Sequence, residues 1–209
     1  MFHKYVKFFF LAISTILLIS CSDNNDEYSA ISPVSVNLST VPYAKLSDYH
    51  FFVGDMKNQV PESDLLPYEP ASSLFTDYAH KKRFVYIPKG SKATYDGDGN
   101  VLSLPVGSAI IKTFYYEKVQ PSNSTKIIET RLMIKKADGW IFAEYVWNNE
   151  QTEAYLEMNG SNVSIDYKDE NNTLQSVPNY RIPNVVQCII CHKSKQMVNN
   201  VEVETYIPI

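Results

Sequence analysis

The stretch Lys126-Ile127-Ile128-Glu129-Thr130-Arg131-Leu132-Met133-Ile134-Lys135 carries the pattern that decides the fold class of this chain. Side chains alternate along it between two faces, with Ile128, Thr130, Leu132 and Ile134 on one and Glu129, Arg131 and Met133 on the other. A period of two is that of a β-strand. One face is expected to pack on a core and the other to meet water, as in an antiparallel sheet.

Strand-like segments flank this stretch on both sides. Residues 109–117 precede it, and residues 140–147 follow the turn signal Asp138-Gly139. Turn signals also recur at Asp96-Gly97-Asp98-Gly99-Asn100 and at Asn159-Gly160, where they predict hairpins. The remaining predicted strands are residues 84–87, 93–95, 101–104, 153–158, 163–167 and 174–177. The pattern predicts a mainly β protein, an antiparallel β-sandwich or open barrel.

Two short helices are expected before the strands, within a β-rich domain that spans residues 44–180. In residues 45–53, Leu46, Tyr49 and Val53 have helical spacing, Ser47 is a candidate cap and Gly54 a candidate stop. Residues 72–80 are the second candidate. We expect both helices to pack against one end of the sheet.

The N-terminus is typical of an exported bacterial lipoprotein. Lys4 and Lys7 precede an apolar run at residues 8–19, which predicts a signal peptide over residues 1–20. The run ends in Leu18-Ile19-Ser20-Cys21, which resembles a lipobox and predicts a lipid on Cys21. Residues 21–43 are read as a polar tether. These features predict a lipid-anchored protein of the cell envelope, at the outer membrane, on its periplasmic or surface face.

Charge argues against nucleic acid as a partner. The chain has a formal net charge of −4. Removal of residues 1–20 takes away two of its 19 basic residues and no acid, which leaves 17 basic and 23 acidic side chains and a net charge of −6. A surface of this sign cannot neutralise phosphates.

Cys188-Ile189-Ile190-Cys191-His192 is the motif that carries chemistry. Attachment of haem c needs this spacing, because two thiols add to the two vinyl groups of the porphyrin and the following histidine ligates the iron. The thiols must be reduced at that moment, and the chain must be exported. The motif therefore predicts covalent haem c on Cys188 and Cys191, with His192 as the proximal iron ligand.

Two other uses of the cysteines stay open. A Cys188–Cys191 disulfide is possible in an oxidising compartment, although redox pairs of this spacing usually begin a helix after a strand in a βαβ unit. A zinc site needs further ligands, and the distant histidines His50 and His80 are not paired in sequence. Haem attachment is the favoured interpretation.

The distal haem ligand is not evident from the sequence. Met197 follows His192 too closely to reach the opposite face of a porphyrin. The ligand then comes from the β-domain, or the haem domain continues beyond residue 209. We favour the second possibility, so residues 181–209 are expected to be the start of a helical cytochrome c module, C-terminally truncated. The β-domain offers the distal candidates His50, His80, Met133 and Met158.

Several segments together resemble a family of exported dihaem c-type cytochromes. In that family the motif follows the β-region and leads into a segment like Pro-Ile-Gly-Pro-Lys, and Ile207-Pro208-Ile209 resembles its start. The resemblance implies electron transfer with a redox partner protein, although this chain holds one motif where the family has two. The matching segments are 45–49, 66–69, 74–79, 83–88, 105–107, 110–114, 129–132, 145–148 and 179–184.

No catalytic residue is assigned from the sequence. The acidic residues Glu144, Glu150, Glu153 and Glu157 are expected to be solvated at the surface. An electron carrier or redox subunit is therefore favoured over a stand-alone enzyme. The alternative function is a surface-exposed binding lipoprotein without haem, in which the two cysteines of the motif form a disulfide.

Overall fold

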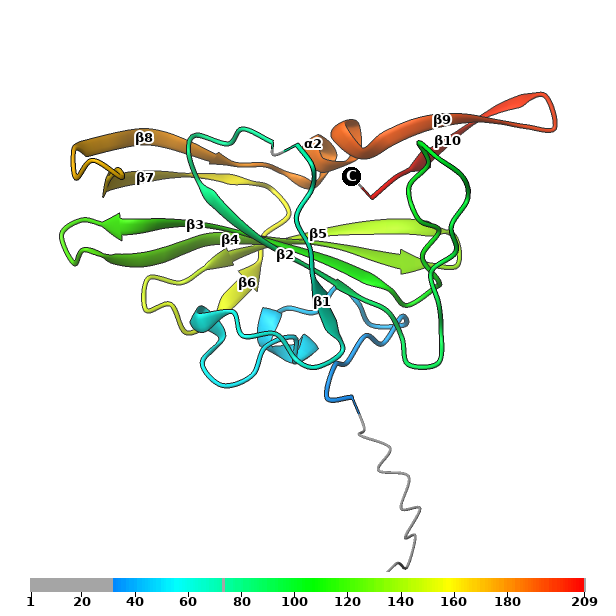
Figure 1. Ribbon diagram of the computed structural model, residues 1–209, viewed down its shortest axis with the longest axis horizontal. Coiled ribbons are helices and arrows are strands. Elements are labelled where there is room, and N and C mark those ends of the chain that lie inside the picture. The colour runs from blue at the N-terminus through cyan, green and yellow to red at the C-terminus, as the bar shows by residue number, and fades with distance from the viewer. Residues whose placement is uncertain (1–31, 73, 209) are drawn as a thin grey trace, which may run out of the picture. The chain divides into compact units, whose positions relative to one another are not determined.

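The computed structural model describes residues 32–72 and 74–208, so Cys21 and the expected signal peptide lie outside the described residues. The fold is mainly β, as predicted, and centres on an eight-stranded antiparallel sheet (Figure 1). Its strands are β1 (Leu65–Pro67), β2 (His80–Tyr86), β3 (Ala109–Val119), β4 (Ser124–Lys136), β5 (Gly139–Trp147), β6 (Ala154–Leu156), β7 (Ser161–Lys168) and β8 (Leu174–Ile182).

Strands β1 to β6 follow one another across the sheet in chain order. The long strand β3 serves two partners along one edge: β2 pairs with residues 109–115, and β7 pairs farther along at Val119 and Tyr167. Strand β8 then pairs with β7. The β7–β8 hairpin lies over one face of the central strands (Figure 1), where Ile165, Tyr167 and Tyr180 pack in a cluster with residues of β3 and β4.

The opposite face of the sheet is covered by residues 34–62, which include the short 3-10 helices η1 (Leu46–Tyr49) and η2 (Met56–Asn58). Tyr49 is buried there, and its hydroxyl lies 3.0 Å from that of Tyr145 on β5. Val34 and Val41 are also buried in this core, at 8% and 7% exposure. The tether predicted for residues 21–43 is therefore wrong for its last part, because these valines pack on the sheet.

The two helices expected before the strands are not formed as predicted. Residues 45–53 contain only η1, which ends at Tyr49 and is followed by His50 in the left-handed region (φ 53°). Its buried residues Leu46 and Tyr49 are three apart, which suits a 3-10 turn. The described residues of 72–80 hold no helix, and β2 begins at His80.

Two predicted hairpins also differ. Residues 93–95 and 101–104 share one isolated bridge, Thr94 with Ser103, and form no ladder. Asn159-Gly160 does connect two strands, but β6 pairs with β5 and β7 pairs with β8. Turn residues alone do not determine which strands pair.

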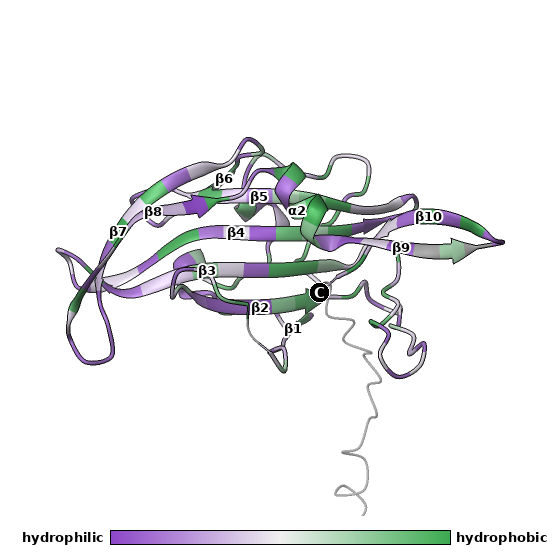
Figure 2. Cartoon of the chain, turned by 90° about the horizontal axis from the view of Figure 1, so that it is seen from above, coloured by the Kyte–Doolittle hydropathy of each residue, from purple (hydrophilic) through white to green (hydrophobic). Residues whose placement is uncertain are grey.

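The expectation of one wet face for β4 is wrong, because both of its faces are buried. Glu129 and Thr130 are each 0% exposed although they point to opposite faces. A β-bulge also moves Ile128 from its predicted face: Phe114 pairs with Glu129, whereas Tyr115 pairs with Ile127. Polar and apolar residues follow one another along the central strands (Figure 2).

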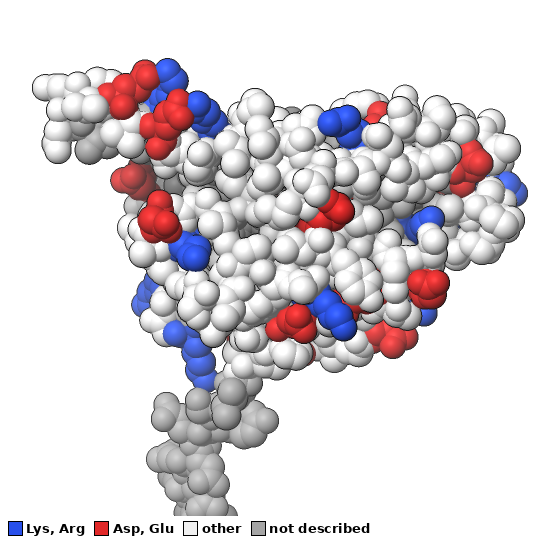
Figure 3. Space-filling model, turned by 180° about the vertical axis from the view of Figure 1, so that it is seen from behind, with Lys and Arg blue, Asp and Glu red and all other residues white. Residues whose placement is uncertain are grey.

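The chain then leaves β8 and forms one helix, α2 (Val185–His192), followed by β9 (Lys193–Val198) and β10 (Val201–Tyr206). The last two strands form a separate hairpin where a helical module was expected. Acidic and basic side chains gather on it (Figure 3), with Lys193 paired to Glu204 and Lys195 to Glu202. Among the described residues, no helix is long and apolar enough to cross a membrane.

Candidate haem-attachment site

The helix α2 begins at a capping box. The side chain of Asn184 accepts a hydrogen bond from the Gln187 amide at 3.0 Å, and the side chain of Gln187 accepts one from the Asn184 amide at 3.0 Å. These two bonds satisfy amides that a helix start leaves without partners. A helix as short as α2 depends on such a cap and on packing against the sheet. The cap therefore fixes where the motif begins.

The helix places Cys188 and Cys191 one turn apart, so they lie on neighbouring positions of its surface. Cys188 is half-buried against a cluster that contains Met133, Trp140 and Phe142, and Cys191 is exposed. Both are free thiols. Burial raises the pKa of the Cys188 thiol, with the charge of Arg131 opposing the shift. The structure thus brings the two predicted attachment residues to neighbouring positions on one short helix.

His192 is the last residue of the same helix and forms hydrogen bonds with Ile207, near the end of the described chain. Its Nδ1 lies 2.9 Å from the carbonyl oxygen of Ile207, and the Ile207 amide donates to the His192 carbonyl at 2.9 Å. The imidazole lies 5.4 Å from the ring of Phe142. Burial lowers the pKa of His192. A neutral imidazole whose Nδ1 proton is bonded to a carbonyl leaves Nε2 free as a ligand atom.

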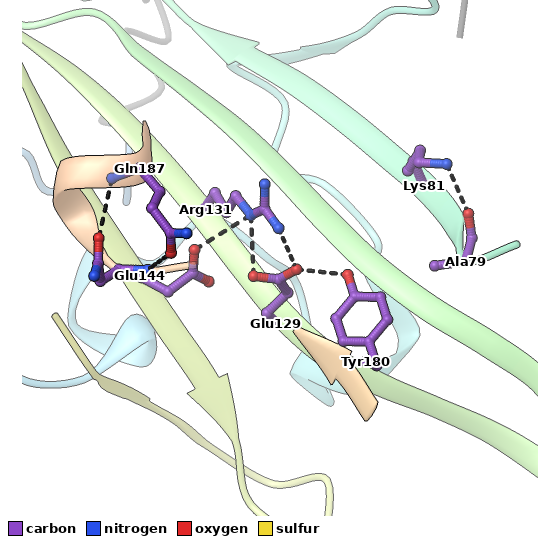
Figure 4. A network of polar contacts seen from close by, with 8 residues as sticks. Ala79, Lys81, Glu129, Arg131, Glu144, Tyr180 and Gln187 are labelled. Carbon is purple, nitrogen blue, oxygen red and sulfur yellow. Dashed lines mark hydrogen bonds and ion pairs between the residues drawn. The ribbon is translucent and has the colours of Figure 1, made fainter. Parts of the chain in front are cut away.

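The sheet below α2 carries a buried charge network (Figure 4). Arg131 donates to Glu129 through Nε at 3.0 Å and through a terminal nitrogen at 2.5 Å. The Tyr180 hydroxyl donates to the same carboxylate at 2.6 Å. Glu129 is 0% exposed, so its charge is compensated by Arg131 and Tyr180 together.

Glu144 lies on the other side of Arg131 and is less well satisfied. Its Oε2 is 3.3 Å from Arg131 Nε, but neither carboxylate oxygen has a hydrogen-bond partner in the described part of the chain. At 1% exposure the residue is buried, so the expectation that it is solvated is wrong. Burial, reinforced by the Glu129 charge, raises the pKa of Glu144 well above its usual value. The Cys188 thiol adds to this shift, which places the motif beside the network.

The predicted distal candidates divide between the two faces of the sheet. Met133 is buried beneath α2, and the carbonyl of Met158 accepts a hydrogen bond from the Val185 amide at 3.2 Å. His80 stacks on Tyr115, which packs against the core of the opposite face. His50 lies in the segment that covers that same opposite face. The two methionines are therefore near the motif helix and the two histidines are not.

The arrangement of possible metal ligands bears on the zinc alternative. Within residues 32–72 and 74–208, no three His, Cys, Asp or Glu side chains are arranged to hold a metal ion. The three residues of the motif therefore do not converge as zinc ligands would. Thioether attachment requires no such convergence, because the sulfurs bond to the porphyrin edge and His192 alone ligates iron.

Sequence reasoning missed Glu129, Arg131, Glu144 and Tyr180 as neighbours of the motif. The available signal was the pair of charged residues, Glu129 and Arg131, inside a strand otherwise rich in apolar residues. By itself that pattern predicts a solvated face, because the strand sequence does not show that the distant segment at residues 161–192 buries it.

The chain matches no protein-family model, no curated protein and no solved structure.

Proposed function

We propose that this protein binds one haem c covalently and transfers single electrons in the cell envelope. Cys188 and Cys191 form the thioethers and His192 ligates the iron. The observation that carries the proposal is the contact between His192 Nδ1 and the Ile207 carbonyl at 2.9 Å. Histidines that bind metal ions almost always donate their other ring N–H to a carbonyl, carboxylate or water.

The chain's own residues contribute orientation and protonation state. The Ile207 carbonyl selects the Nδ1-H tautomer and fixes the ring, and burial favours the neutral imidazole that a metal requires. The buried cluster under α2 holds Cys188, while Cys191 and Ile190 are exposed on the helix. A redox partner protein can therefore approach α2 from outside. When bound, the haem iron supplies the one-electron redox chemistry.

The location of the protein is part of the same proposal. A signal peptide and a lipid on Cys21 would export the chain and attach it to a membrane, and export is required for haem c attachment. The motif and the segments around it resemble those of exported c-type cytochromes. We therefore place the protein on a membrane of the envelope, where it exchanges electrons with another protein.

A haem stain on a denaturing gel tests the attachment. The full chain is expressed with and without a c-type maturation system, alongside a Cys188→Ala, Cys191→Ala double variant and a His192→Ala variant. We expect a stained band for the wild type only with the maturation system, no band for the double variant and a weak band for His192→Ala. Circular dichroism of each variant checks that the sheet is retained.

An unstained wild type would refute the haem proposal. If mass spectrometry then found Cys188 and Cys191 oxidised to a disulfide, the protein would be the alternative, a binding lipoprotein without haem. Cys21→Ser is the control for location. It should release the protein from membranes and leave the haem stain unchanged, because lipidation and haem attachment use different cysteines.

A further inference from the structure

A row of charged residues crosses four strands beneath α2. The register pairs Arg83 on β2 with Lys112 on β3, Lys112 with Arg131 on β4, and Arg131 with Glu144 on β5. Residues paired in this way point to the same face of an antiparallel sheet. Met133, two residues beyond Arg131, packs with Cys188 in the cluster under α2. The row therefore lies on the face that the motif helix covers.

Lys112 is the cation of this row without an ion-pair partner in the part of the chain that the structure describes. Arg83 is paired with Glu69 at 3.0 Å, and Arg131 is held by Glu129 and flanked by Glu144. Among the described residues, no carboxylate lies within ion-pair distance of Lys112. Its ammonium is instead 5.1 Å from the centre of the Phe114 ring. A half-buried charge without a counter-ion is costly.

The strand register places this cation on the sheet face that carries Met133 and that α2 covers. Burial lowers the pKa of Lys112 to about 8, the charges of Arg131, Arg83 and Lys81 add to the shift, and the charge of Glu129 opposes it. The ammonium is thus still charged at neutral pH. A half-buried cation without an ion-pair partner in the described part of the chain is a candidate contact for an anion.

We propose that Lys112 forms an ion pair with a carboxylate of the ligand that α2 carries. The inference rests on the proposed function, and for haem c that group is a porphyrin propionate. Arg83 and Arg131 are already paired with carboxylates of the chain, which leaves Lys112 to make the contact. The ion pair would balance the charge that is unmatched in the haem-free protein and would fix the rotation of the porphyrin about its attachment edge.

The test compares stability with and without haem. The proposal predicts that Lys112 lowers the stability of the haem-free chain and raises that of the haem-bearing chain. In the haem-free chain, Lys112→Met removes a half-buried charge that has no ion-pair partner among the described residues, and should raise the Tm by about 2–4 °C. In the haem-bearing chain the same substitution removes an ion pair and should lower the Tm by a similar amount. Lys112→Arg keeps the charge and should behave like the wild type with haem. Lys92→Met, at an exposed position, is the matched control for loss of one lysine. Its effect on the Tm should have the same sign in the haem-free and the haem-bearing chain.

Each outcome has a distinct meaning. A gain from Lys112→Met that is equal in both forms would overturn the ion pair while covalent haem still supports the proposed function. A wild-type chain that takes up no haem overturns both. Titration with inorganic phosphate separates a free anion from a propionate: if phosphate stabilises the haem-free wild type but not Lys112→Met, and haem adds no difference, Lys112 serves a free anion and the proposal is wrong.

Discussion

Glu129 and Glu144 lie on either side of one guanidinium and are equally buried, yet their surroundings differ. Glu129 accepts hydrogen bonds from Arg131 and from Tyr180, whereas Glu144 has no hydrogen-bond partner in the described residues. We expect Glu129→Gln to lower the free energy of unfolding by about 3 kcal/mol, because it leaves the Arg131 charge without its main partner. Glu144→Gln should cost less than about 1 kcal/mol, since an amide resembles the protonated acid.

Urea unfolding at several pH values checks this pair of substitutions. The pKa of Glu144 is raised in the folded protein, so the folded state binds more protons than the unfolded state above the usual range of a glutamate. Wild-type stability therefore falls as pH rises through this window. Glu144→Gln removes that slope and should become the more stable protein toward pH 8. Equal losses for both variants would contradict the assignment of the charge to Glu129.

Lys112 gives a second pH-dependent prediction, on the alkaline side. Its pKa is about 8 in the folded protein and 10.5 in the reference state, so between these values the unfolded chain binds more protons. Wild-type stability should rise with pH through this window, relative to Lys112→Met. The gain from Lys112→Met in haem-free protein should thus be largest at pH 7 and shrink by pH 10. Thermal unfolding at pH 7, 9 and 10 measures the Tm difference between Lys112→Met and the wild type. A difference that does not change with pH would show that folding does not lower the pKa of Lys112.

At the scale of elements, Gly160 immediately precedes β7 and lies against the backbone that leads from β8 into α2. A Cβ at this position would lie 2.8 Å from both the Asn184 nitrogen and the Ile182 oxygen, and the residue has φ +75°. We expect Gly160→Ala to lower stability by more than about 1 kcal/mol and to reduce haem attachment, because it pushes the helix cap away. Gly99→Ala is the matched control, with φ +83° and nothing within 4 Å. Similar losses for both would mean that backbone strain alone acts at Gly160.

The positions of the strands along the sequence were easier to predict than the pairing between them. The alternation in residues 126–135 and the apolar runs around it located β3, β4 and β5, because these segments have a local pattern. The bulge at Ile128, the branching of β7 from β3 and the missing hairpin at residues 93–104 depend on contacts between distant segments. Likewise the Cys188, Cys191 and His192 spacing located the motif, whereas the buried network beneath it depends on how β8 and α2 cover the sheet.

At the scale of the whole molecule, the segment before η1 is part of the core. Val34 and Val41 are buried and Val36, Leu38 and Tyr43 pack against the same cluster. A chain that begins at residue 44 should therefore be less stable than one that begins at residue 32, by at least the about 1.5–3 kcal/mol that one buried valine contributes. Urea unfolding of the two shortened chains measures the difference. Equal stability of the two chains would support the prediction that residues 32–43 belong to a tether.

The link between β8 and α2 consists of Pro183 and Asn184 alone, and Ile182 at its start is still paired with Ser161. The motif helix therefore begins only two residues after the paired end of β8, which limits how far it can move independently of the sheet. For the electron transfer proposed above, such a short link means that little of the protein needs to rearrange when the charge on the cofactor changes. A small rearrangement means a low barrier to each electron transfer. The sheet would thus support the proposed redox chemistry by limiting movement of the site.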